Sequence, residues 1–160
     1  MTPLRTWRRE SRLLLIVAEL AKASPATMQD VLTVDFLLQH PSLLNRFPFE
    51  DVASLPSSVR PSDAETDSSE EALLRWKRSV LDRILHPMIG RLIARGLITG
   101  SDGGSFRLHP RSQRVAEQLR ESLGEQELAR LQLVGAQVAA ASSDDASAWL
   151  RAALGEEATP

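Results

Sequence analysis

Apolar residues recur at intervals of three and four along much of this chain, and short polar or proline-containing breaks separate the runs. Such spacing is typical of amphipathic helices and predicts a mainly α-helical fold. The first helix is expected over residues 4–23. Ser24 as N-cap and Pro25 in the first helical position then predict a second helix that runs to about His40, where Pro41 ends it.

After the second helix the pattern becomes polar. A short helical turn is expected over residues 42–47, and residues 48–68 hold three prolines with many serines and several acids, which predicts a long loop. Ser68 and Glu71 have the spacing of a capping box and predict a third helix over about 69–86. Its inward face is expected to comprise Leu73, Val80, Leu81, Ile84, Leu85 and Met88.

Pro87 predicts a kink or a break in this helix, because proline removes a backbone donor and crowds the preceding turn. A separate short helix is then expected over residues 88–95, in the position of a recognition helix. Its expected inward residues are Met88, Ile89, Leu92 and Ile93, and its expected outward residues are Gly90, Arg91, Ala94 and Arg95.

Gly96 follows as a helix C-terminal cap, where a residue that tolerates positive φ is preferred. Residues 97–99 and 105–108 flank a Gly-rich turn and predict a β-hairpin. Further helices are expected over about 110–124 and 125–141, and after Asp144 or Asp145. Helix, Gly-Leu-Ile, hairpin and helix in this order predict a winged helix-turn-helix with a two-stranded wing and extra C-terminal helices. We assign residues 1–124 to this domain and 125–160 to a C-terminal helical extension.

The composition excludes several classes of protein. The 160 residues include no cysteine, so the chain has no disulfide, no thiolate metal site and no cysteine nucleophile. The apolar run over residues 13–18 is far too short to span a bilayer, so we expect a cytoplasmic protein with no membrane partner.

The net charge is −2, which taken alone argues against a nucleic-acid binder, but the charges are unevenly distributed. Residues 75–120 hold ten Lys or Arg and three acids, whereas residues 121–160 hold two arginines and seven acids. This is either chance scatter or the footprint of a surface that binds anions. The candidate residues for binding DNA or a partner are Arg75, Arg78, Arg91, Arg95, Arg107 and Arg111. Arg91 and Arg95 would contact DNA phosphates or an acidic partner helix, or would only offset the helix dipole.

Two further groups are candidates for partner contacts. Arg8 and Arg9 carry the wrong sign for a helix N-terminus, so they are either solvated or held by an acidic partner. Trp149 and Leu150, near the C-terminus, either contact a partner or dock on their own domain. Asp35 lies within an apolar run, and the structural interpretation is a bond to a backbone end or to an arginine; a catalytic role would lack a second acid or base.

The sequence carries no motif of an active site. The glycines of residues 100–104 lack the Gly-Lys-Ser ending of a phosphate-binding loop, and no Ser/His/Asp arrangement appears. The histidines have no ligand-like spacing: His40, His86 and His109. We therefore predict no catalytic residue, no metal site, no cofactor and no enzymatic activity.

Residues 34–44, VDFLLQHPSLL, together with the Gly96-Leu97-Ile98 turn and the helix after the wing, resemble the middle components of bacterial ABC-three component systems. The resemblance covers roughly residues 10–125, and Lamassu-type systems are a related example. It implies a small winged-helix protein that sits between an SMC- or RecF-like ATPase and an effector subunit in anti-phage or anti-plasmid defence. It implies no catalytic residues.

Two functions are therefore expected from the sequence. The first is a non-enzymatic accessory subunit that binds the ATPase and the effector, with contacts to double-stranded DNA through phosphates. The alternative is a stand-alone transcriptional regulator, in which a dimer places two short helices in successive major grooves. The alternative requires base-reading side chains on residues 88–95, where only Arg91 and Arg95 qualify.

Overall fold

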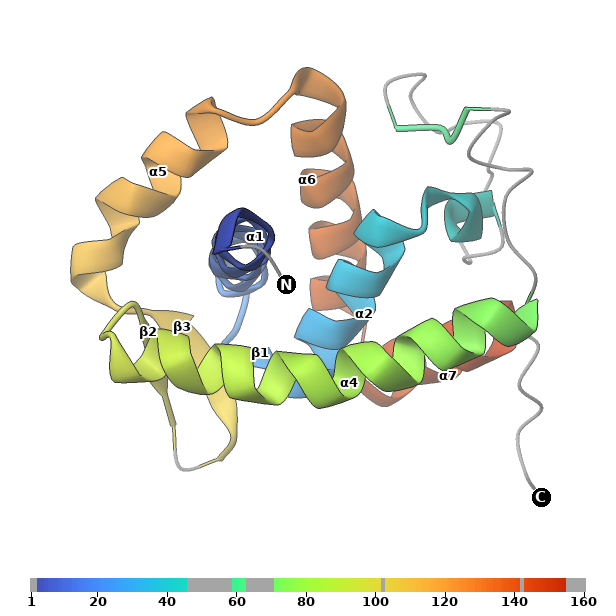
Figure 1. Ribbon diagram of the computed structural model, residues 1–160, viewed down its shortest axis with the longest axis horizontal. Helices are drawn as coiled ribbons and strands as arrows, with labels where there is room; N and C mark the ends of the chain where they lie inside the picture. Colours follow the sequence, from blue (N-terminus) through green and yellow to red (C-terminus); the bar gives the residue numbers. More distant parts are fainter. Residues whose placement is uncertain (1–2, 46–58, 63–70, 102, 142, 155–160) are drawn as a thin grey trace.

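The computed structural model describes residues 3–45, 59–62, 71–101, 103–141 and 143–154 (Figure 1). Helices account for most of this part of the chain, as the sequence predicts, and a small antiparallel sheet accompanies them. The predicted capping box at Ser68, most of the loop over 48–68 and the end of the turn over 42–47 lie outside the described residues. In chain order the elements are α1 (Pro3–Leu20), β1 (Ala26–Thr27), α2 (Met28–Gln39), the 3₁₀ turn η1 (Pro41–Asn45), α4 (Glu71–Ala94), β2 (Ile98–Gly100), β3 (Ser105–Leu108), the 3₁₀ turn η3 (Pro110–Ser112), α5 (Gln113–Glu121), α6 (Glu125–Ala140) and α7 (Ser143–Ala153).

Helix α1 is the central element of the fold. Residues 13–17 are all at most 3% exposed, and five consecutive residues cover the whole circumference of a helix. A helix that is apolar on all sides is normally enclosed by other elements. Figure 1 shows α1 end-on at the centre, with α2, α4, α5 and α6 around it.

The sheet contains one strand that the sequence analysis missed. Its order is β1-β3-β2, with β3 in the middle. The hairpin between β2 and β3 is confirmed, with Ile98 opposite Leu108. On the other side, Ala26 pairs with Phe106, so the chain is still extended where Ser24 and Pro25 were expected to start a helix. That expectation was wrong: Thr27 is the N-cap of α2, and its hydroxyl accepts a hydrogen bond of 3.1 Å from the Asp30 amide.

The sequence predicted a kink or a break at Pro87, and the break is wrong. Helix α4 continues through Pro87, and residues 88–94 are the end of this helix rather than a separate one. Pro87 is exposed, so its ring and the carbonyl group that it leaves without a donor lie on the solvent side. Leu85 and Met88 on either side are buried and hold both halves of the helix to one core.

The inward face of α4 is rotated from the predicted one at both ends. Leu74 is buried, whereas Leu73 and Ile93, both expected to face inward, are 43% and 39% exposed. The helix end was predicted correctly. Gly96 has φ of +71°, and the Leu97 amide donates to the Leu92 carbonyl at 3.0 Å, which is the bond of a Schellman cap.

The C-terminal helices share the core of the rest of the chain. Helix α6 packs against both α1 and α2, and α7 packs against α2. Gly135 allows the close approach of α6, because a Cβ atom there would lie 2.7 Å from the Cγ atom of Glu19. Asp144 and Asp145 lie inside the first turn of α7 rather than at its cap. Among the described residues, no helix has the length and apolar character needed to cross a membrane.

Candidate interaction site

Arg91 and Arg95 both form an ion pair with Glu10 of the same chain. The Nε atom of Arg91 lies 3.3 Å from one carboxylate oxygen of Glu10, and Nη1 of Arg95 lies 2.9 Å from the other. Glu10 belongs to α1 and is only 4% exposed, whereas both arginine side chains are about half exposed. The two arginines therefore connect the end of α4 to α1, and they neutralise a buried carboxylate.

The other arginines of the predicted basic surface do not form one cluster. Arg75 and Arg78 lie near the start of α4, and a helix rise of 1.5 Å per residue places Arg75 about 24 Å from Arg91 along the axis. Arg107, on β3, is exposed. Arg111 is exposed too, and its Nε atom donates to the Gly96 carbonyl at 3.4 Å, next to the end of α4.

Apart from Arg91, the exposed residues of α4 from Pro87 onward are small or apolar. They are Pro87, Gly90, Ile93 and Ala94. None of these side chains carries a hydrogen-bond donor or acceptor that could read a base edge. The only base-reading candidates expected here were Arg91 and Arg95, and both are bonded to Glu10.

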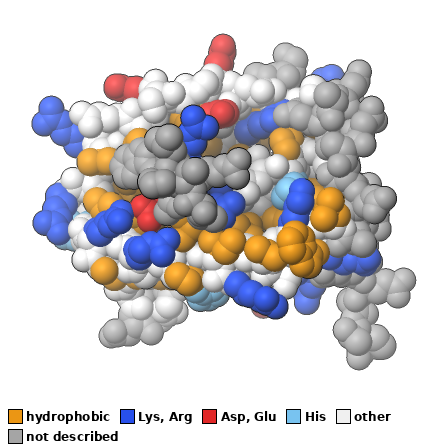
Figure 2. All heavy atoms as spheres, in the orientation of Figure 1, with side chains coloured by type: hydrophobic (Ala, Val, Ile, Leu, Met, Phe, Trp, Pro, Cys, Tyr) orange, Lys and Arg blue, Asp and Glu red, His pale blue; other side chains and the backbone are white. Residues whose placement is uncertain are grey.

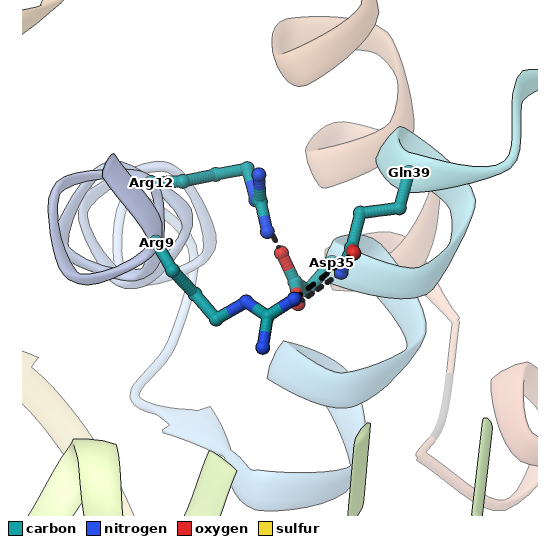
Figure 3. A network of polar contacts seen from close by, with 4 residues as sticks. All are labelled: Arg9, Arg12, Asp35 and Gln39. Atoms are coloured by element: carbon teal, nitrogen blue, oxygen red, sulfur yellow. Dashed lines mark hydrogen bonds and ion pairs between the residues drawn. The ribbon is translucent and has the colours of Figure 1, made fainter. Parts of the chain in front are cut away.

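Asp35 is the centre of a buried polar network between α1 and α2 (Figure 3). Its side chain is fully buried; one oxygen lies 2.5 Å from Nε of Arg12, and the other accepts a hydrogen bond of 2.8 Å from Gln39. Arg9 extends the network through a bond of 3.5 Å to Gln39. The sequence predicted a bond from Asp35 to a backbone end or to an arginine, and in the structure the partner is an arginine. Arg9 joins this network, whereas Arg8 is exposed.

A groove that the sequence analysis missed lies between α2 and α4. Its volume is about 260 Å³. The lining residues are Arg9 of α1, Phe36 and Gln39 of α2, His40 after α2, and Trp76, Lys77, Val80, Leu81 and Ile84 of α4. Trp76 is 63% exposed, the highest value among the large apolar residues that the structure describes as exposed. Figure 2 shows hydrophobic side chains gathered along α4, with Lys and Arg side chains among them.

The sequence does contain a signal for this groove. Leu73, Trp76, Val80 and Ile84 follow one another at intervals of three and four. They form a second apolar stripe beside the buried one, so the apolar arc of α4 is wider than its contact with the core. Trp149, by contrast, is half-buried, and Leu150 is fully buried in the core. Leu150 therefore presents no surface to a partner, and its assignment as a partner contact is corrected.

His40 lines the same groove, with its ring centroid 4.6 Å from that of Phe36. Burial and the nearby Lys77 ammonium lower the pKa of His40 from 6.5 to about 4. Between these two pH values the unfolded chain binds a proton at this position that the folded chain does not bind. The free energy of unfolding therefore falls as the pH falls from about 6.5 to about 4.

We expect His40→Gln to reduce this acid sensitivity. Because the ring is only half-buried, the loss due to His40 should be about 1–2 kcal/mol between pH 7 and pH 4.5. Urea unfolding at both pH values measures it, with the wild type losing about that much more stability than the variant. If both proteins lose the same free energy of unfolding between pH 7 and pH 4.5, the pKa of His40 is not lowered in the folded state.

A second hollow, of about 1010 Å³, lies between α1, α2, α5 and α6. Arg8, Arg12 and Arg130 line it, together with Glu127. Arg130 is buried, and its guanidinium donates to the carbonyl groups of Val59 and Arg60, each at 3.0 Å. These two hydrogen bonds therefore connect residues 59–60 to α6.

Comparison of the chain with models of known protein families, with curated proteins and with solved structures gave no match.

Proposed function

We propose that this protein is a non-enzymatic accessory subunit that binds protein partners through a winged helix-turn-helix domain. The order α1-β1-α2-α4-β2-β3 and the sheet order β1-β3-β2 support the winged-helix assignment. In this assignment α4 takes the place of the recognition helix, and the hairpin of β2 and β3 is the wing. The partners are an SMC- or RecF-like ATPase and an effector subunit, and the context is defence against phages or plasmids.

One observation favours a protein partner over a DNA operator. The solvent face of α4 after Pro87 has small and apolar side chains, and its two arginines are bonded to Glu10. Sequence-specific DNA binding by a recognition helix needs several side chains that bond to base edges. Small side chains instead allow another backbone to approach closely. This supports the accessory subunit over the transcriptional regulator.

Contacts to DNA phosphates are a second, compatible activity. Arg107 and Arg111 are exposed on the wing and just after it. Such contacts add affinity without sequence preference, and they weaken steeply with salt.

Co-expression with an SMC- or RecF-like ATPase encoded beside this chain tests the proposal. We expect the two proteins to co-purify as a complex that survives size-exclusion chromatography in about 0.3 M salt, because protein contacts of mixed apolar and polar character resist screening. Separate elution of the two proteins at all salt concentrations would contradict the proposed function.

A further inference from the structure

We propose that the groove between α2 and α4 binds an acidic amphipathic helix of the ATPase. This inference rests on the proposed function and adds to it the surface used and the chemistry of the partner segment.

The groove offers apolar surface that the core does not use. Leu74, Leu81 and Leu85 already attach α4 to the rest of the protein, each at most 4% exposed. Trp76 at 63% and Leu73 at 43% exposure lie on the neighbouring stripe. A single exposed apolar residue is ordinary, but a tryptophan and a leucine three residues apart beside a hollow are typical of a binding surface.

The apolar stripe that borders the groove is long enough for a helix to lie along it. The stripe from Leu73 to Ile84 is about 17 Å long, or about three turns. Phe36, Gln39 and His40 provide the opposite wall. A partner helix with apolar residues at positions i, i+3 or i+4, and i+7 would place one face against the stripe.

The groove is positively charged, and this favours a partner segment of negative charge. Arg9 and Lys77 line it, and no Asp or Glu does so within the part of the chain that the structure describes. Among the described residues, the only acid bonded to a lining residue is Asp35, which is fully buried and already bonded to Arg12. A partner helix with Asp or Glu beside its apolar face would therefore meet complementary charge.

The same charges argue against a second copy of this chain as the occupant. The segment 71–94 carries five Lys or Arg and two acids. Two copies of α4 laid side by side would bring these cations together, and like charges facing one another at an interface are unfavourable. An acidic partner helix has no such conflict.

Trp76→Glu tests the groove directly, and Val115→Glu is the matched control, since Val115 is also an exposed apolar residue but lies on α5. Both positions are exposed, so both variants should fold, which circular dichroism checks. We expect Trp76→Glu to weaken binding of the full-length chain to the purified ATPase about 30-fold or more, as loss of an aromatic anchor does. Val115→Glu should change it less than about threefold.

A photo-crosslinking residue at position 76 provides the second measurement. We expect it to capture the ATPase within a segment that is both amphipathic and acidic, as identified by mass spectrometry. Unchanged affinity of Trp76→Glu, or capture of the effector, of a basic segment or of a second copy, would overturn this inference and leave the accessory function standing. Failure of the wild-type chain to bind the ATPase would overturn the accessory function itself, together with the inference built on it.

Discussion

Arg12→Ala is expected to lower the free energy of unfolding by about 3–4 kcal/mol. The substitution removes the only cation that the structure places against Asp35 among the described residues, and Asp35 is fully buried. A buried carboxylate without a counter-charge costs far more than the loss of a surface ion pair. Gln39 would still donate one hydrogen bond to it, which offsets only part of the cost. Urea unfolding at pH 7 measures the change.

The double variant Arg12→Ala with Asp35→Asn is the control for this interpretation. Asparagine has nearly the same shape and no charge, and its amide can still bond to Gln39. We expect the double variant to be more stable than Arg12→Ala alone, by about 1–2 kcal/mol, because the unpaired charge is gone. If it is no more stable, the role of Arg12 is packing of its aliphatic part and not neutralisation of Asp35.

Arg91→Glu combined with Arg95→Glu is expected to destabilise the protein by about 3 kcal/mol. It would place two carboxylates beside Glu10, which is 4% exposed and bonded to both arginines. The loss of stability should be no larger than this, because positions 91 and 95 are half exposed and the new side chains can turn toward solvent. The sequence predicted that both arginines face outward, in which case this double variant would fold normally. The structure predicts the opposite result.

Adding Glu10→Gln to that variant separates charge from geometry. Without the carboxylate at position 10 its repulsion with the two new glutamates disappears, so we expect at least half of the lost stability to return, as measured by thermal unfolding. Failure of Glu10→Gln to restore any stability would show that Arg91 and Arg95 act through contacts other than the pair with Glu10.

Local features of this fold could be predicted from the sequence. The Gly96 cap depends on one residue that tolerates positive φ, and the hairpin depends on alternation around a Gly-rich turn, so both were found. A bonded partner for Asp35 was also anticipated, because an acid inside an apolar run needs one, but the sequence did not choose between a backbone end and an arginine.

Features that depend on distant parts of the chain could not be predicted. Strand β1 has two residues, and only its pairing with β3, about 80 positions away, makes it a strand. Glu10 meets Arg91 and Arg95 across a similar separation. Helix α4 continues through Pro87 because the core holds both sides of it, which is a tertiary effect that overrides a local preference.

The candidate groove could be predicted only in part. Its stripe on α4 is visible in the sequence as apolar residues beyond those the core needs. Its other wall comes from the end of α2, and only the fold brings the two together.

Titration of the full-length chain with short duplex DNA of random and of defined sequences, at about 50 and 200 mM salt, tests most directly whether α4 faces a protein or reads DNA. We predict weak binding that is the same for all sequences and falls steeply with salt, because the proposed contacts of Arg107 and Arg111 are to phosphates. Tight binding that selects one sequence and persists at the higher salt concentration would contradict the account.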